Sequence, residues 1–116
     1  MRVQQERLIV ITCCCDVERN NIVDKEMQRK DRNKTLQVFR VTTPTDKEAV
    51  LKFIIRFQKS GDVAFEFQFK EITQVISERA SMGIFTLILN KDSSGGAPTV
   101  NLSLLQRNVP IGASTF

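Results

Sequence analysis

The sequence predicts an α+β fold, a single domain over residues 1–116 that is mainly antiparallel β, with about six strands and one amphipathic helix. Three observations lead to this prediction. Most apolar segments are short and rich in β-branched residues. Two alternating runs flank a glycine-containing loop. One stretch shows apolar residues at helical spacing.

The predicted strands follow from these short apolar runs. Residues 7–17 (RLIVITCCCDV) are nearly continuously apolar, which predicts a strand buried on both faces. Thr45 and Glu48 match a capping box, so residues 51–57 could begin as a helix. Their alternation, and the matching alternation of residues 63–69 beyond the loop at 59–62, favours a β-hairpin. The remaining predicted strands span residues 35–42, 84–89 and 99–106.

The amphipathic helix is predicted at about residues 70–81, where Ile72, Val75, Ile76 and Ala80 fall on one helical face. Gly83 supplies a stop signal just beyond it. Residues 18–34 form either a charged helix or a mobile loop. An apolar stripe of Ile22, Val23 and Met27 favours a short helix at about 22–29.

The chain lacks the residue types that most enzymes and metal sites use. Histidine, the commonest general base and metal ligand, is absent. In a strand, Cys13 and Cys15 point to one face and Cys14 to the other, so the triplet cannot close a tetrahedral thiolate site. We expect small buried side chains at these positions. The sequence therefore predicts no catalytic residue, no metal and no cofactor.

The charge distribution and the apolar runs indicate which partners and which cellular location to expect. The net charge of +4 is spread along the chain, so we do not expect nucleic-acid binding. The densest basic stretch contains Arg29, Lys30, Arg32 and Lys34, which we interpret as a solvated segment, with contact to an acidic partner as the alternative. No apolar run approaches the length of a transmembrane helix. With no signal-peptide pattern and an odd number of cysteines, we expect a cytoplasmic protein.

Three segments resemble a known family. They are residues 38–46 with 50–55, a strand that passes into a helix at 63–81, and residues 97–102 with 108–111. Their order resembles the globular head domains of the centriolar cartwheel family, which share a superfamily with scaffold heads of double-strand-break repair. The resemblance implies isologous head pairing through an apolar side chain on the last hairpin loop. The matching positions are Val109, Pro110 and Ile111, with Phe116 if the register is shifted.

We therefore expect a non-enzymatic scaffold module that self-associates weakly and meets other scaffold proteins at the centriole or basal body. The alternative is a binding module of pleckstrin-homology type, in which a twisted antiparallel barrel presents Arg29, Lys30, Arg32 and Lys34 to acidic lipid headgroups or an acidic peptide. That fold needs a helix after its last strand. The helix predicted here precedes the last two strands, which counts against the alternative.

Overall fold

A computed structural model describes residues 3–30, 32–45, 48–93 and 95–105 of the chain. Within these ranges there are eight strands, one short α-helix and two 3-10 turns. In chain order they are β1 (Gln4–Arg19), β2 (Ile22–Val23), α1 (Lys25–Lys30), β3 (Asn33–Thr42), β4 (Val50–Phe57), β5 (Val63–Gln68), η1 (Phe69–Glu71), β6 (Ile72–Arg79), η2 (Ala80–Met82), β7 (Ile84–Leu89) and β8 (Thr99–Leu104). The predicted antiparallel β architecture is confirmed, with more strands than expected.

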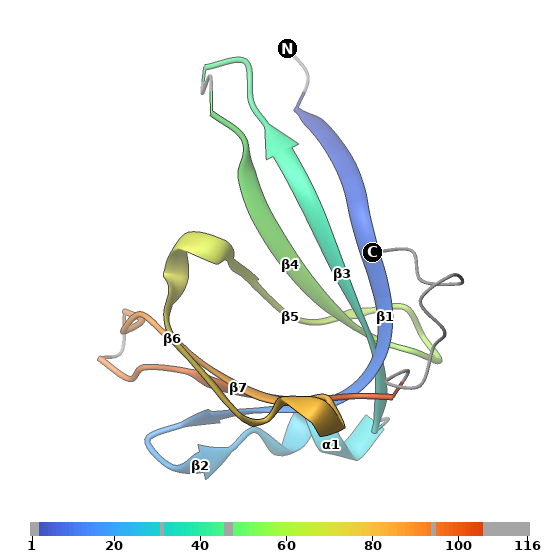
Figure 1. Ribbon diagram of the computed structural model, residues 1–116, viewed down its shortest axis with the longest axis vertical. Coiled ribbons are helices and arrows are strands. Elements are labelled where there is room, and N and C mark those ends of the chain that lie inside the picture. The colour runs from blue at the N-terminus through green and yellow to red at the C-terminus, as the bar shows by residue number, and fades with distance from the viewer. Residues whose placement is uncertain (1–2, 31, 46–47, 94, 106–116) are drawn as a thin grey trace.

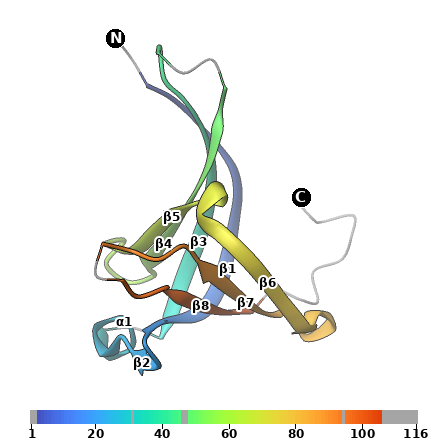
Figure 2. The ribbon, with the colours of Figure 1, turned by 90° about the vertical axis from the view of Figure 1, so that its left-hand side faces the viewer.

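All the strands belong to one curved sheet in the order β5-β4-β3-β1-β8-β7-β6, and β2 pairs with the end of β1. Strand β1 pairs with β3 from Gln4 to Cys14 and with β8 from Cys13 to Glu18. Figures 1 and 2 show β3 and β4 running along the molecule, while β7 and β8 run across it. The bend in β1 is therefore a corner that joins two half-sheets.

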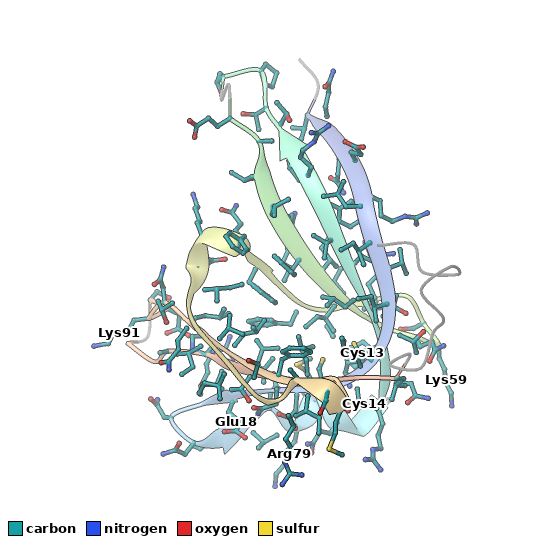
Figure 3. All side chains as sticks on the ribbon, viewed as in Figure 1. Cys13, Cys14, Glu18, Lys59, Arg79 and Lys91 are labelled. Atoms are coloured by element: carbon teal, nitrogen blue, oxygen red, sulfur yellow. The ribbon has the colours of Figure 1, made fainter. Side chains whose placement is uncertain are left out.

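A second connection joins the two half-sheets at their outer margins. The chain leaves β5, at one end of the strand order, and reaches β6, at the other end, through η1 alone. The backbone N–H of Asn90, just after β7, donates to the carbonyl of Glu71 in η1 at 2.8 Å. The two half-sheets thus enclose one space, which side chains fill (Figure 3).

The core lies between the half-sheets and comes from nearly every strand. Its buried members are Cys13, Cys15, Val17, Met27, Leu36, Ile55, Phe67, Leu87, Leu89, Val100 and Leu102. Burying a large apolar side chain contributes about 1.5–3 kcal/mol, so this cluster is the main source of stability. The prediction that β1 is buried on both faces is wrong, because Leu8 and Val10 are each 41% exposed.

The predicted hairpin is confirmed as β4 and β5. Phe53 pairs with Phe67, and the two rings stack with their centroids 5.0 Å apart. Alternation predicted this hairpin well because one face of each strand packs on the core. The Gly61 backbone has φ of 77°, a conformation that glycine adopts without strain.

The helix predicted at about 70–81 is wrong. That segment is the strand β6, which pairs with β7 and is flanked by η1 and η2. Its β-branched residues, such as Val75 and Ile76, favour an extended chain once a neighbouring strand is available. The supposed apolar face is not buried, since Val75 is 53% exposed. Gly83 is a real stop signal, with φ of 73°, but it ends the 3-10 turn η2.

The short helix predicted at about 22–29 is shifted. Ile22 and Val23 form β2, which pairs with the end of β1, and the helix α1 begins only at Lys25. Two asparagines with positive φ, Asn20 and Asn21, make the turn between β1 and β2. Positive φ at both central residues is the signature of a type I′ hairpin turn, for which asparagine is well suited. The adjacent pair Asn20-Asn21 could therefore have been recognised in the sequence as a hairpin turn.

Candidate functional site

A cleft of ≈ 280 Å³ lies where β1 parts from β3. The pairing of these strands ends at Cys14 and Asn33, after which β1 continues beside β8. The chain between β1 and β3, which includes α1, borders the gap. The cleft is lined by Cys14, Cys15, Asp16, Gln28, Arg32 and Lys34. Residues from two strands and their connection therefore share one site.

Lys34 is the unusual residue of this cleft, because it is only 1% exposed. Its place in β3 puts it on the same inward face as Leu36, directly opposite Cys13 of β1. The ammonium donates to the carbonyl oxygen of Arg32 at 3.3 Å and lies 5.6 Å from the centre of the Phe57 ring. A buried ammonium is costly without such partners, and an aromatic face supplies one of them.

Two of the four predicted basic residues meet in this cleft. Arg32 is exposed and stands just before β3, while Lys34 forms part of the inner wall. Arg29 and Lys30 occupy the end of α1, in the same connection, but their side chains lie outside the described part of the structure. The sequence interpretation of this stretch as a solvated segment is therefore wrong for Lys34.

One carboxylate shares the cleft with these cations. Asp16 accepts a hydrogen bond from the Asn101 side-chain amide at 2.8 Å, and Glu18 accepts from the same amide at 3.3 Å. Asn101 comes from β8, so this contact also ties β8 to β1. Among the described lining residues the cations Arg32 and Lys34 outnumber Asp16, so the cleft favours an anion.

The three cysteines lie on alternating faces of β1 as predicted, but the expectation that all three are buried is wrong for Cys14. Cys13 is 0% exposed and Cys15 is 8% exposed, whereas Cys14 is half-buried and its thiol donates to Asn33 Oδ1 at 3.6 Å. A hydrogen bond with Cys15, assisted by the charge of Lys34, lowers the pKa of Cys13 although burial opposes it. The same hydrogen bond, together with burial, raises the pKa of Cys15.

The remaining predictions concern metal binding, self-association and membrane segments. Across the described residues, no group of three or more histidine, cysteine, aspartate or glutamate side chains is placed to hold a metal ion. The self-association residues Val109, Pro110, Ile111 and Phe116 lie outside the described residues. None of the helices in the described ranges is long and apolar enough to cross a membrane.

Sequence reasoning named Lys34 as one of four basic residues but missed that its side chain is buried. The signal was the alternation of β3, in which Lys34, Leu36 and Val38 share one face. Comparison with known proteins adds no further residue, since no protein-family model, curated protein or solved structure matches this chain.

Proposed function

We propose that this chain is a non-enzymatic binding module that holds a phosphate-bearing acidic group, of the kind found in acidic lipid headgroups, in the cleft beside α1. The observation that carries the proposal is the meeting of exposed Arg32 and buried Lys34 in one cleft of ≈ 280 Å³. Phosphate groups are bound most often by arginine forks and lysine point charges.

The environment of Lys34 supports this reading. Its ammonium is already positioned by the Arg32 carbonyl and the Phe57 ring, so little side-chain entropy is lost when an anion arrives. Because the residue is almost fully buried, water screens its charge less than it screens a surface lysine. The cleft volume lies near the lower end for ligand sites, which favours a compact group over an extended acidic peptide.

One part of the argument against a pleckstrin-homology-like module is removed, because β6 occupies the place of the helix predicted before the last two strands. The helix that such a fold needs after its last strand would fall beyond β8, outside the described residues. The strands form a twisted antiparallel sheet that turns a corner at β1 and encloses one core. The connection between β1 and β3, which carries Arg32, then lies at one end of a barrel-like sheet.

Binding to lipid vesicles tests the proposal. Phosphatidylcholine vesicles with and without phosphatidylinositol bisphosphate are sedimented with the protein, and bound protein is measured. Arg32→Ala is expected to weaken binding roughly tenfold or more, since a hydrogen bond to a charged group contributes about 1.5–3 kcal/mol. The matched control is Lys91→Ala, which removes one exposed positive charge from the loop between β7 and β8, away from the cleft (Figure 3).

The control should change binding less than about twofold, because distant surface charges are screened at physiological salt. Equal losses for Arg32→Ala and Lys91→Ala would show that overall charge, and not the cleft, drives binding. Retention of wild-type protein on an acidic peptide column, with no binding to either vesicle, would assign the cleft to acidic peptides and overturn the headgroup proposal.

Self-association is a second candidate, and a different observation favours it. Among the described strands, none pairs with the outer edge of β1 between Gln4 and Ile11. This edge carries the exposed side chains of Leu8 and Val10. An unpaired strand edge can add a strand from another chain. Sedimentation at high concentration, with charged substitutions on this edge, tests this candidate.

A further inference from the structure

The outer edge of β1 is open over its first half. Among the described strands, none pairs with this edge between Gln4 and Ile11. In Figure 1 this part of β1 lies beside β3, on the side away from β4. A hollow of ≈ 270 Å³ is found here, lined by Arg7, Leu8, Ile9 and Val10. An open edge presents a row of backbone N–H and C=O groups, so it can accept another extended segment.

The backbone just beyond β8 follows the same edge. Strand β8 runs antiparallel to β1, and its last residue, Leu104, lies opposite Cys13. The next backbone N–H, that of Leu105, donates to the carbonyl oxygen of Thr12 at 3.0 Å. Each step forward from β8 is thus matched by one step back along β1, and the ladder has already passed the end of β8 by one residue.

We propose that the open edge of β1 is a strand-acceptor site for this chain's own residues 106–109, which follow Leu105 directly. In the register of β8, Arg107 would lie opposite Val10. Hydrogen-bonded pairs recur at every second residue of an antiparallel ladder, and the bond between Leu105 and Thr12 marks one of them. Arg107 and Val10 would therefore form the next hydrogen-bonded pair.

The proposed pairing has a natural end at Val109. The pairing of β1 with β3 shifts register between Arg7 and Ile9, so a bulge at Leu8 interrupts the regular edge. Pro110 follows Val109 in the sequence and has no backbone N–H to donate. The series of backbone donors is therefore broken at the place where the edge becomes irregular.

The side chains along this edge also suit such a partner. Leu8 and Val10 are each 41% exposed, which is high for apolar residues of a long strand. Residues directly opposite each other on paired strands place their side chains in contact on one face. The register of β8 would set Val109 opposite Leu8, so an apolar side chain would cover one of these exposed residues.

This occupant is favoured over a second copy of the chain. A segment tethered to its site has an effective concentration on the order of millimolar, and residues 106–109 are joined to β8 without a linker. A second copy must reach the same edge by diffusion and can pair only when the segment has left it. The segment therefore competes with self-association through β1. The cleft around Arg32 takes no part, so the proposal is independent of phosphate binding.

Residue-resolved amide hydrogen exchange, measured by NMR on the full chain at low concentration, tests the proposal. The Val10 amide points to the open edge, as the Thr12 carbonyl does, whereas the Ile11 amide points to β3. In wild type we expect both amides to be protected. Protection of Val10 then reports the segment, and protection of Ile11 reports the underlying sheet.

Two proline substitutions supply the matched comparison. Arg107→Pro removes the backbone N–H that would donate to the Val10 carbonyl, and it is expected to speed exchange of the Val10 amide about tenfold. Asn108→Pro is the control, because the N–H of residue 108 would point away from β1, where proline is tolerated in an edge strand. Ile11 should exchange at the wild-type rate in both variants, which shows that the sheet itself persists.

Three results overturn the proposal. The first is that the Val10 amide exchanges as fast in wild type as in Arg107→Pro, which would leave the edge unoccupied. The second is that the two proline variants speed Val10 exchange equally, which would exclude the register of β8. The third is that protection of Val10 rises with protein concentration, which would identify a second copy as the occupant and favour self-association instead.

Discussion

Phe67 lies on the inward face of β5, where it pairs with Phe53 of β4 and packs in the core. It is 3% exposed and stacks on Phe53, with Phe65 nearby at a centroid distance of 5.9 Å. We expect Phe67→Ala to lower the free energy of unfolding by about 3–5 kcal/mol, as for other buried aromatic residues. Urea denaturation monitored by circular dichroism measures this loss.

The matched control is Phe69→Ala, two residues further along the chain. Phe69 is 57% exposed, and its ring lies 6.5 Å from that of Phe53, at the outer part of the same stack. We expect a loss of about 1 kcal/mol or less, since a half-exposed ring leaves no sealed cavity when it is removed. Similar losses for the two variants would contradict the assignment of Phe67 to the core.

Single residues also show where sequence patterns compete. A run of charged residues predicts a solvated segment, and that rule suits exposed Arg32. The alternation of a strand predicts that Lys34 shares the inward face with Leu36. The second rule prevails because β3 begins at Asn33, a boundary that the charge pattern conceals. The candidate cleft could not be predicted, since it needs the bend of β1 and the position of α1 as well.

At the scale of elements, the tight passage from η2 into β7 depends on Gly83. Its φ is 73°, and a Cβ atom added there would lie 3.1 Å from the carbonyl oxygen of Leu104. Gly61 in the β4–β5 turn has a similar φ of 77° but faces open space. Both Gly→Ala variants carry the backbone cost of about 1–2 kcal/mol for a left-handed residue.

Gly83→Ala is therefore expected to destabilise the chain more than Gly61→Ala, because only Gly83 adds a crowded contact with β8. Thermal unfolding of the two variants beside wild type measures the difference. A larger loss for Gly61→Ala would show that the packing of β8 against this turn is looser than described.

The elements also explain why the helix prediction at 70–81 failed. Apolar residues at helical spacing, such as Ile72 and Ile76, satisfy a helical pattern and a bulged strand equally well. The pairing of β6 with β7 shifts register twice, so its apolar residues do not follow strict alternation. Only the presence of β7 as a partner decides between the two, and a local pattern does not contain that information.

At the scale of the whole molecule, the open edge of β1 makes self-association testable. Pairing along one strand edge buries a limited area, so we expect a weak dimer with a dissociation constant of tens to hundreds of micromolar, or roughly 5–6 kcal/mol. Leu8→Lys should abolish it, since charged side chains block addition to a strand edge. Analytical ultracentrifugation over a concentration series measures this.

The control for this experiment is Val63→Lys, which places the same charge on β5, another outer strand of the sheet. Val63 is 47% exposed, close to the 41% of Leu8, but β5 is a strand of only 6 residues. It should leave the dimer unchanged. If wild type remains monomeric throughout, or if both variants dissociate equally, the β1 edge is not the interface.

The order of the strands in the sheet was harder to predict from the sequence than the strands themselves. Strand segments such as 84–89 were predicted within a residue or two, because their local composition specifies an extended chain. The strand order was not, because β1 and β8 lie at opposite ends of the sequence and become neighbours only in the folded chain. The corner at β1, which creates the cleft, is a product of that distant pairing.

The same distant pairing imposes an order of events on a ribosome. The contact between Asp16 and Asn101 joins residues 85 positions apart, so it can form only after β8 has been synthesised. Until residues 99–104 leave the ribosome, the part of β1 that pairs with them has no partner on that side. The thiols of Cys13 and Cys15 are then accessible to oxidants and to other proteins. Among the described strands, the last to be synthesised is therefore the one that covers this part of the first.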